Sequence, residues 1–201
     1  MDVLMSAREQ ELFRAFLSRS KGYFEFGVGG STLLASRVVD GPVVAVDSDS
    51  AWIEMASKSL PASAHPRRLV HVDIGPVGKF GMPVSDAHRE HFPRYSGAIR
   101  EVAEPIDLCL VDGRFRVACA LQALQALPAD AVVGVHDYRK RAQYHVIEYV
   151  ARPIAEVETL TFFVRRTDTH RRSLVSILKG RPGRAQRRIE ALLKTHAFNP
   201  A

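Results

Sequence analysis

The sequence of 201 residues predicts an α/β fold, with one doubly wound, mostly parallel β-sheet and helices on both of its faces. Two observations support this prediction. Five apolar, strand-like segments each precede a segment with helical periodicity, and this alternation is typical of a parallel sheet. Further along, two strand-like segments follow each other without a helix between them, which predicts a hairpin and one antiparallel strand. Right-handed crossovers restrict the topology further.

Length and composition fit a single domain that spans residues 1–201. No run of about 18 apolar residues is present, so no membrane-spanning helix is predicted, and the charged N-terminus is unlike a signal peptide. The two cysteines, Cys109 and Cys119, lie in apolar runs without the spacing of metal ligands. We therefore expect buried, reduced thiols and a cytoplasmic location.

The first expected element is a helix within residues 1–20. Apolar residues recur at helical spacing from Leu12 onward within residues 6–19. Ser6 is followed three residues later by Glu9, which is the pattern of a capping box. The sequence therefore predicts that this helix begins directly after Ser6.

Strand-like and helix-like segments then alternate along the chain. The strand-like segments are rich in Val, Ile, Leu and Phe and are near-continuously apolar, as strands buried on both faces of a parallel sheet are. The predicted strands cover residues 22–27, 42–49, 67–74, 106–113 and 131–137. The predicted helices cover residues 31–39, 50–60, 114–127 and 143–151.

Two regions depart from this alternation. Residues 75–104 are irregular, with one short helix predicted around residues 86–91, and we expect this insertion to cover the substrate. The antiparallel hairpin is predicted from residues 155–166 and 171–180. A basic helix is expected within residues 181–201.

The net charge of +6 is unevenly distributed. Residues 165–194 hold ten Lys or Arg residues and two acids. Such a segment either binds nucleic acid, anionic lipid or an acidic substrate, or forms a solvated basic face. No aromatic RNA-binding motif accompanies this segment to favour nucleic-acid binding. Nucleic-acid binding through the segment is therefore only an alternative.

The segment EFGVGGST, from Glu25 to Thr32, is the first candidate for a binding site. In a doubly wound sheet, ligands bind at the C-terminal ends of the strands, where this segment lies. Gly27 and Gly29 allow the backbone to approach a ligand closely. The dinucleotide fingerprint requires a third glycine where Thr32 stands. An ionised Glu25 would repel a pyrophosphate and suit a cationic amino group, so the turn argues against a dinucleotide.

Acidic residues follow the next two predicted strands. Asp47 lies 20 residues after Gly27, where an acid can accept both hydroxyls of a ribose. This position would serve a nicotinamide or an adenosine cofactor equally. Asp73 ends the third strand and is a candidate either for accepting from an adenine amino group or for capping a loop.

Taken in order, the segments YFEFGVGGST, VVAVDSD, LVHVDI, IDLCLVDG and AVVGVHDY resemble the motifs of class I S-adenosylmethionine-dependent methyltransferases. The resemblance covers roughly residues 20–180 and includes the closing hairpin, which the dehydrogenase fold lacks. It implies a Rossmann-like, seven-stranded sheet in the order 3-2-1-4-5-7-6.

The same resemblance implies a binding site for S-adenosylmethionine. Asp47 would bind the ribose hydroxyls, Asp73 would lie near the adenine, and the glycine turn would line the methionine end. Ser31 departs from the family pattern, because a third glycine usually stands there. The implied cofactor-binding residues are Glu25, Gly27, Gly29, Ser31, Asp47 and Asp73.

The ends of the fourth and fifth strands carry the candidate catalytic residues. Methyl transfer requires positioning and, for some acceptors, a base. His136, with an ordinary pKa near ~6.5, is the candidate base, and Asp112 and Asp137 would orient it. A divalent metal held by these three residues is an alternative that we do not favour, since the catechol-type enzymes they resemble offer an acid and an amide instead. Arg114 and Arg116 either grip an acidic acceptor or lie on the surface.

We therefore expect a transferase, an S-adenosylmethionine-dependent methyltransferase that acts by O-methylation on a small molecule or a saccharide. Oxygen is favoured because the Asn/Asp-Pro-Pro-Tyr signature of amino methyltransferases is missing near residues 136–138. The alternatives are a non-catalytic, methyltransferase-like protein that binds nucleic acid or a partner, and a nicotinamide-dependent oxidoreductase. The second lacks both the third glycine and a Tyr-x-x-x-Lys set.

Overall fold

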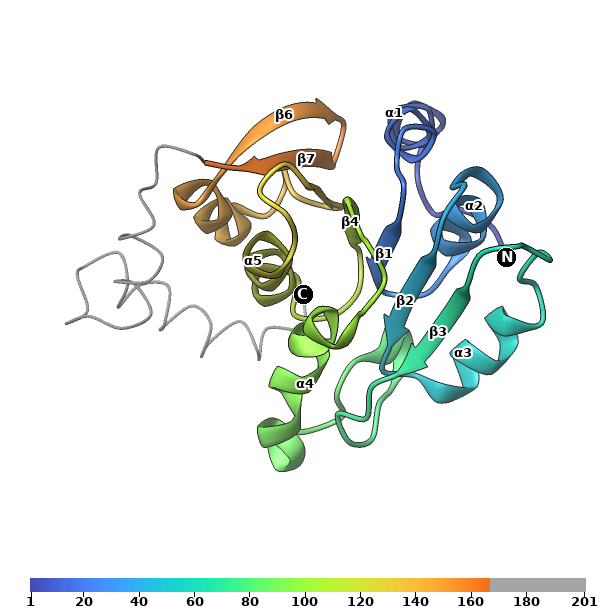
Figure 1. The fold of residues 1–201 in the computed structure, drawn as a ribbon. Coiled ribbons are helices and arrows are strands. Elements are labelled where there is room, and N and C mark those ends of the chain that lie inside the picture. The colour runs from blue at the N-terminus through green and yellow to red at the C-terminus, as the bar shows by residue number, and fades with distance from the viewer. Residues whose placement is uncertain (167–201) are drawn as a thin grey trace.

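The computed structural model describes residues 1–166, which form an α/β fold around one seven-stranded sheet (Figure 1). The strand order is β3-β2-β1-β4-β5-β7-β6. Strands β1 to β5 run parallel, and β7 pairs antiparallel with both β5 and β6. The predicted fold class and strand order are confirmed.

The elements have the following bounds. The strands are β1 (Tyr23–Phe26), β2 (Val43–Asp47), β3 (Arg67–His71), β4 (Leu108–Val111), β5 (Val132–Val135), β6 (Ala151–Val157) and β7 (Leu160–Arg165). The α-helices are α1 (Ala7–Leu17), α2 (Gly30–Val38), α3 (Ser50–Ser57), α4 (Phe92–Gly97) and α5 (Arg116–Ala126). Short 3₁₀-helices are η1 (Lys79–Gly81), η2 (Asp86–His91), η3 (Ala98–Glu101) and η4 (Ala142–Tyr149). None of the helices in this part of the chain is long and apolar enough to cross a membrane.

The central strands are apolar at nearly every position because helices cover both faces of the sheet. In β1, Phe24 and Phe26 pack into the core beneath α4 and α5. The alternate residue Tyr23 packs into a second core against α1 and α2. Figure 1 shows these two layers on opposite sides of the sheet. Because successive side chains of a strand point to opposite faces, one apolar strand supplies both cores.

The predicted capping box at the first helix is confirmed. The backbone N–H of Glu9 donates to Oγ of Ser6 at 3.2 Å, and the backbone N–H of Ser6 donates to Oε2 of Glu9 at 2.9 Å. Two free N–H groups at the start of α1 are thereby satisfied.

The closing hairpin exists, but the sequence placed it wrongly. The predicted strand 155–166 contains the turn, at Glu158 and Thr159, and β6 begins at Ala151, where a helix was expected to end. Glu158 adopts a φ of 50°, a conformation usually signalled by glycine or asparagine, so nothing in the sequence marked the turn. The predicted strand 171–180 and the predicted basic helix within 181–201 lie outside the described residues.

The irregular segment 75–104 divides into two parts. Its second part contains α4, whose Phe92 and Tyr95 are buried in the main core, although only a helix around residues 86–91 was predicted. Pro93 lies in the first turn of α4, where a proline is tolerated but interrupts the sequence pattern. The first part contains a loop closed by an antiparallel bridge between Val77 and Pro83.

Asp107 fixes the entry into β1. Its carboxylate accepts from Oγ of Ser20 at 2.7 Å and from the backbone N–H groups of Lys21 at 3.0 Å and Gly22 at 3.2 Å. We expect Asp107→Ala to lower the free energy of unfolding by about 1–3 kcal/mol, because two backbone donors lose their partner. Urea denaturation measures this change. Asp130→Ala, at an exposed aspartate near the same edge of the sheet, is the control and should leave the midpoint unchanged; equal effects would contradict the assignment.

Candidate functional site

The glycine turn after β1 touches the turn after β4. Gly27 has a φ of 102°, and a Cβ there would lie 2.8 Å from the backbone nitrogen of Gly113. Both the conformation and the space therefore require glycine at this position. The close approach brings the C-terminal ends of β1 and β4 together, which is the edge where ligands bind in such sheets.

Gly29 presents bare backbone to open space. A Cβ at this position would meet no atom closer than Oγ of Ser31, at 4.0 Å. Gly29 is the N-cap residue of α2, and its N–H donates to Oγ1 of Thr32 at 3.0 Å. The turn thus offers a ligand an uncovered stretch of backbone next to the first turn of a helix.

Asp47, at the end of β2, is bound to the same turn. Its Oδ2 accepts from the N–H of Val28 at 2.9 Å, and its Oδ1 accepts from the N–H of Asp49 at 3.0 Å. Burial raises the pKa of this carboxyl despite these hydrogen bonds. Trp52 of α3 completes the anchoring, because its indole N–H donates to the carbonyl of Val28 at 2.6 Å. Nothing in the sequence marks Trp52 as part of the site, because it stands at an ordinary position of a helix.

Glu25 is fully buried and does not face an open site. Its carboxyl oxygens are hydrogen-bonded to the hydroxyls of Ser31 and of Thr32, the latter at 2.7 Å. Burial raises its pKa to about 8, so the group is mainly neutral at neutral pH. The expectation that an ionised Glu25 acts on the ligand directly stays a prediction, and in this conformation the carboxyl group is buried beneath the turn. Glu25 and Ser31 instead hold the glycine turn in place from beneath.

Asp73 is exposed, and its Oδ1 accepts from the N–H of Gly75 at 2.8 Å, so here it caps a loop. This hydrogen bond lowers its pKa. A cavity of about 280 Å³ beside it is lined by valines of β2 and β3 and by Arg94 of α4. A larger cavity of about 570 Å³ lies at the opposite edge of the sheet, around Pro105 and Leu127. Of these two cavities, the smaller one borders the C-terminal end of β3.

The 77–83 loop lies over the ends of β2 and β4. Oγ of Ser48 donates to the carbonyl of Gly81 at 2.9 Å, and a Cβ on Gly81 would lie 3.2 Å from Oδ1 of Asp47. At the tip, Phe80 adopts a φ of 60° and is 70% exposed. The loop thus rests on the carboxylate that the sequence analysis assigned to a ribose.

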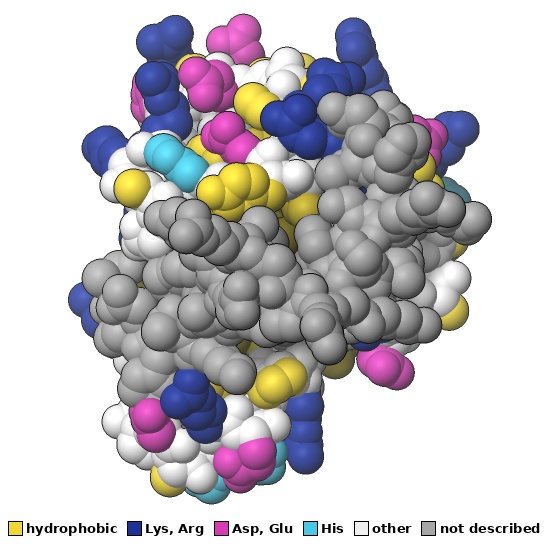
Figure 2. Space-filling model, turned by 90° about the vertical axis from the view of Figure 1, so that its left-hand side faces the viewer, with side chains coloured by type: hydrophobic (Ala, Val, Ile, Leu, Met, Phe, Trp, Pro, Cys, Tyr) yellow, Lys and Arg dark blue, Asp and Glu magenta, His cyan; other side chains and the backbone are white. Residues whose placement is uncertain are grey.

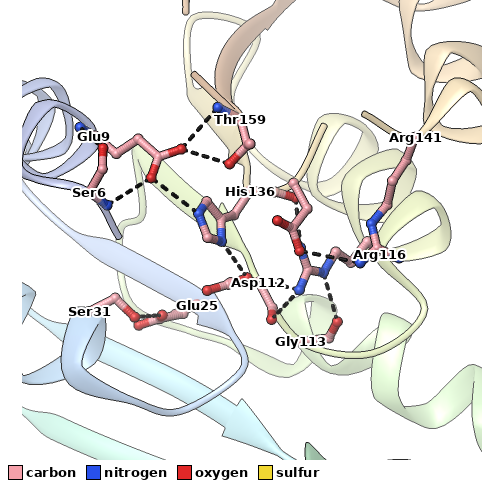
Figure 3. A network of polar contacts seen from close by, with 11 residues as sticks. Ser6, Glu9, Glu25, Ser31, Asp112, Gly113, Arg116, His136, Arg141 and Thr159 are labelled. Atoms are coloured by element: carbon pink, nitrogen blue, oxygen red, sulfur yellow. Dashed lines mark hydrogen bonds and ion pairs between the residues drawn. The ribbon is translucent and has the colours of Figure 1, made fainter. Parts of the chain in front are cut away.

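His136 and Asp112 lie in one polar network with Glu9 (Figure 3), and Asp137 joins it through Arg116. Nδ1 of His136 is 3.0 Å from Oδ1 of Asp112, and Nε2 is 3.6 Å from Oε2 of Glu9. Burial alone would lower the pKa of His136, but the hydrogen bond and charge of Asp112 outweigh it and raise the pKa. The ring therefore lies between two carboxylates.

Glu9 joins this network to the closing hairpin. Its Oε1 accepts from the N–H of Thr159 at 2.9 Å and from Oγ1 of Thr159 at 2.6 Å. Burial alone would raise its pKa, but the hydrogen bonds from Thr159 and Ser6 lower it to about 2. The capping-box pattern identified Glu9 as a helix residue; its contact with a turn 150 residues away had no signal in the sequence.

Arg116 belongs to the same network, and its hydrogen bonds and ion pairs are made within the protein. It pairs with Asp112 at 2.9 Å and with Asp137 at 3.1 Å, and it donates to the carbonyls of Gly113 at 3.1 Å and His136 at 2.7 Å. Within residues 1–166, no group of three or more His, Cys, Asp or Glu side chains is arranged to hold a metal ion.

The fold is shared with solved methyltransferases. A methyltransferase-like protein from Silicibacter pomeroyi is 30% identical, with a TM-score of 0.77, and the match covers 86% of this chain and 95% of that one. An O-methyltransferase from Bacillus cereus, in complex with S-adenosylhomocysteine, is 14% identical, with a TM-score of 0.52 and coverage of 80% and 82%. NodS, an N-methyltransferase from Bradyrhizobium japonicum in complex with S-adenosylhomocysteine, is 13% identical, with a TM-score of 0.53 and coverage of 79% and 86%. No protein-family model matches the sequence, and no curated protein does.

The buried Glu25 makes stability depend on pH. Its pKa is about 8 in the folded chain against an ordinary 4.5, so the folded state holds the proton more tightly and stability falls as the pH rises between these values. We expect Glu25→Gln to remove this decline, because the amide does not ionise. Urea midpoints of both proteins at about pH 5 and about pH 8 test it. Equal declines would contradict a neutral Glu25.

The hydrogen bond and charge of Asp112 raise the pKa of His136, whereas burial raises that of Glu25. The contribution of His136 to stability is complete below the pKa of an unfolded histidine and is lost as the pH rises through the folded value. We expect Glu9→Gln to lower the pKa of His136, because one of the two facing carboxylates loses its charge. An NMR titration of the imidazole measures this directly. Glu11→Gln, on the exposed face of α1, is the matched control, and an equal effect there would contradict the contact.

Proposed function

The chain belongs to the class I S-adenosylmethionine-dependent methyltransferase family, and from this premise we propose that it binds S-adenosylmethionine at the glycine turn and methylates an oxygen atom of a small molecule or a saccharide. The observation that carries the proposal is the attachment of the Asp47 carboxylate to the N–H of Val28. This hydrogen bond holds the carboxylate next to the glycine turn, which supports the proposal that Asp47 accepts from the ribose hydroxyls.

The residues at this edge fit such a cofactor. Asp47 has lone pairs left on both oxygens for ribose hydroxyls, and Gly29 has no Cβ to occupy the space above the turn. Glu25 and Ser31 act from below, as residues that fix the shape of the turn. S-adenosylmethionine supplies a sulfonium-activated methyl group for in-line displacement.

The proposed base is His136, oriented by Asp112, with Asp137 holding the network through Arg116. To accept a proton, the imidazole of His136 has to be neutral, with Nε2 facing the hydroxyl of the acceptor. The separation of 3.6 Å between Nε2 and Oε2 of Glu9 is longer than a hydrogen bond, so this nitrogen is not held by Glu9. Oxygen is proposed as the acceptor atom because the amino-methyltransferase signature is missing.

A cytoplasmic location is proposed on the state of the cysteines. Cys109 and Cys119 are both free and buried. Thiols of this kind are usual in a reducing compartment.

A non-catalytic role in nucleic-acid binding is the second candidate. Residues 1–166 carry equal numbers of basic and acidic residues, so the net charge of +6 arises in residues 167–201. On the face that Figure 2 shows, the visible basic and acidic side chains are interspersed. The candidate therefore depends on the basic end, and salt-sensitive RNA binding that is lost on truncation after residue 180 would favour it.

The cofactor site is tested by titration with S-adenosylhomocysteine. We expect saturable binding in calorimetry, accompanied by a change in the fluorescence of Trp52, the single tryptophan, which contacts Val28. Asp47→Ala should weaken binding by about tenfold or more, because charge-assisted hydrogen bonds are lost.

Asp130→Ala is the matched control and should bind as the wild type does. A second arm with NADH separates the family from the nicotinamide-dependent oxidoreductases. The proposal would be overturned if S-adenosylhomocysteine bound neither protein, or bound Asp47→Ala as tightly as the wild type.

A further inference from the structure

Arg114 is a half-buried cation that makes no ion pair among residues 1–166. Its Nε is buried and makes no hydrogen bond within this part of the chain, and no carboxylate of these residues lies within ion-pair distance of its guanidinium. Nη1 donates to Sδ of Met82. A thioether is a weak acceptor and does not neutralise a charge.

The contrast with Arg116 shows how unusual this is. Arg116 is also buried, but it is surrounded by the carboxylates of Asp112 and Asp137 and by three backbone carbonyls. Asp112 in turn is already bound by Arg116 and His136. Burial, and then repulsion from Arg116, lower the pKa of Arg114, and the charge of the more distant Asp112 opposes this without restoring it. A buried guanidinium destabilises a fold unless it is paired, so an unpaired one at a ligand-binding edge indicates that its partner arrives from outside.

The position of Arg114 is next to the proposed cofactor site. It directly follows Gly113, whose backbone lies against Gly27 in the glycine turn. Its contact residue Met82 follows Gly81, which receives the hydrogen bond from Ser48. Arg114 is therefore reached from the same side as Asp47, beneath the 77–83 loop.

We propose that Arg114 binds an anionic group, a carboxylate or a phosphate, of the methyl acceptor, and that Met82 holds the place of this anion in the ligand-free protein. This inference rests on the proposed function and names its substrate class: small acidic acceptors, such as hydroxy acids or acidic sugars. The planar fork of a guanidinium matches a carboxylate or a phosphate in two parallel hydrogen bonds. The soft, flexible side chain of Met82 can leave at small cost.

Matched pairs of acceptors test the proposal with the full chain. Glucuronate and glucose 6-phosphate are compared with glucose, and 3,4-dihydroxybenzoate is compared with 3,4-dihydroxybenzyl alcohol. Thermal shift and Trp52 fluorescence are recorded with and without S-adenosylhomocysteine. We expect the acidic member of at least one pair to bind more tightly by about 10- to 100-fold, the range for a charged hydrogen-bonded pair. The carboxylate and phosphate arms show which anion is preferred.

Variants of Arg114 separate an anion site from a structural role. Arg114→Met should abolish the preference for the acidic member, and Arg114→Lys should keep part of it because the charge remains without the planar fork. Arg19→Met, at an exposed arginine of α1's C-terminal flank, should behave as the wild type. Without ligand, Arg114→Met should have an equal or higher Tm, because an unpaired buried charge is removed.

Two results would overturn the proposal: no preference for acidic acceptors in the wild type, or a preference that Arg114→Met retains. A Tm of Arg114→Met several degrees below that of the wild type, without a loss of the preference, would show a structural role. Failure of S-adenosylhomocysteine binding overturns the proposed function instead, and the titrations without it still decide whether Arg114 binds anions.

Discussion

The contact between the turns at Gly27 and Gly113 is the constraint on which the candidate site depends. At these two positions the backbones of the β1 and β4 ends touch, and a side chain at either one would force them apart. The contact also determines what surrounds it. Tyr95 of α4 packs against Gly113 and donates to the carbonyl of Val46 at 3.4 Å, so the core helix, β2 and both turns form one unit.

Two polar clusters lie on either side of this contact and differ in charge. On one side, Glu25 is neutral and satisfied by hydroxyls, so the glycine turn rests on an uncharged hydrogen-bonded support. On the other side, the imidazole of His136 lies between the carboxyl groups of Glu9 and Asp112, and the hydrogen bond and charge of Asp112 raise its pKa. Buried charges need such partners, and here they come from α1, β4, β5 and the hairpin turn at Thr159. The same network that holds the N-terminal helix in place therefore fixes the residues proposed for proton transfer.

Arg114 is the exception to this balance, because no carboxylate of residues 1–166 forms an ion pair with it. This is the basis of its proposed role in binding an anion. Every other buried charge discussed above has a partner of opposite charge or a set of hydrogen bonds within the described part of the chain. Proteins retain an unpaired buried charge where function needs it, and the retained cost is offset when the ligand binds. The 77–83 loop, with Phe80 in a left-handed conformation, covers Arg114 and Asp47 together. Cofactor and acceptor would therefore enter beneath one and the same loop.

The sequence by itself determined the alternation of strands and helices, the glycine turn and the positions of Asp47, Asp112 and His136 at strand ends, whereas the strand order was expected from the family resemblance. The first three are local properties, because apolar periodicity and glycine spacing are written in consecutive residues. The tertiary structure alone decided which candidate side chains are buried or paired within the protein and which are left to bind a ligand. Glu25 became a buried support, because burial and its neighbours' hydroxyls depend on packing. Arg114 and Arg116 looked alike in the sequence, and only the fold gave one of them carboxylates and left the other without. The hairpin turn at Glu158 was missed because a positive φ there is imposed by strand pairing and leaves no mark in the residue type.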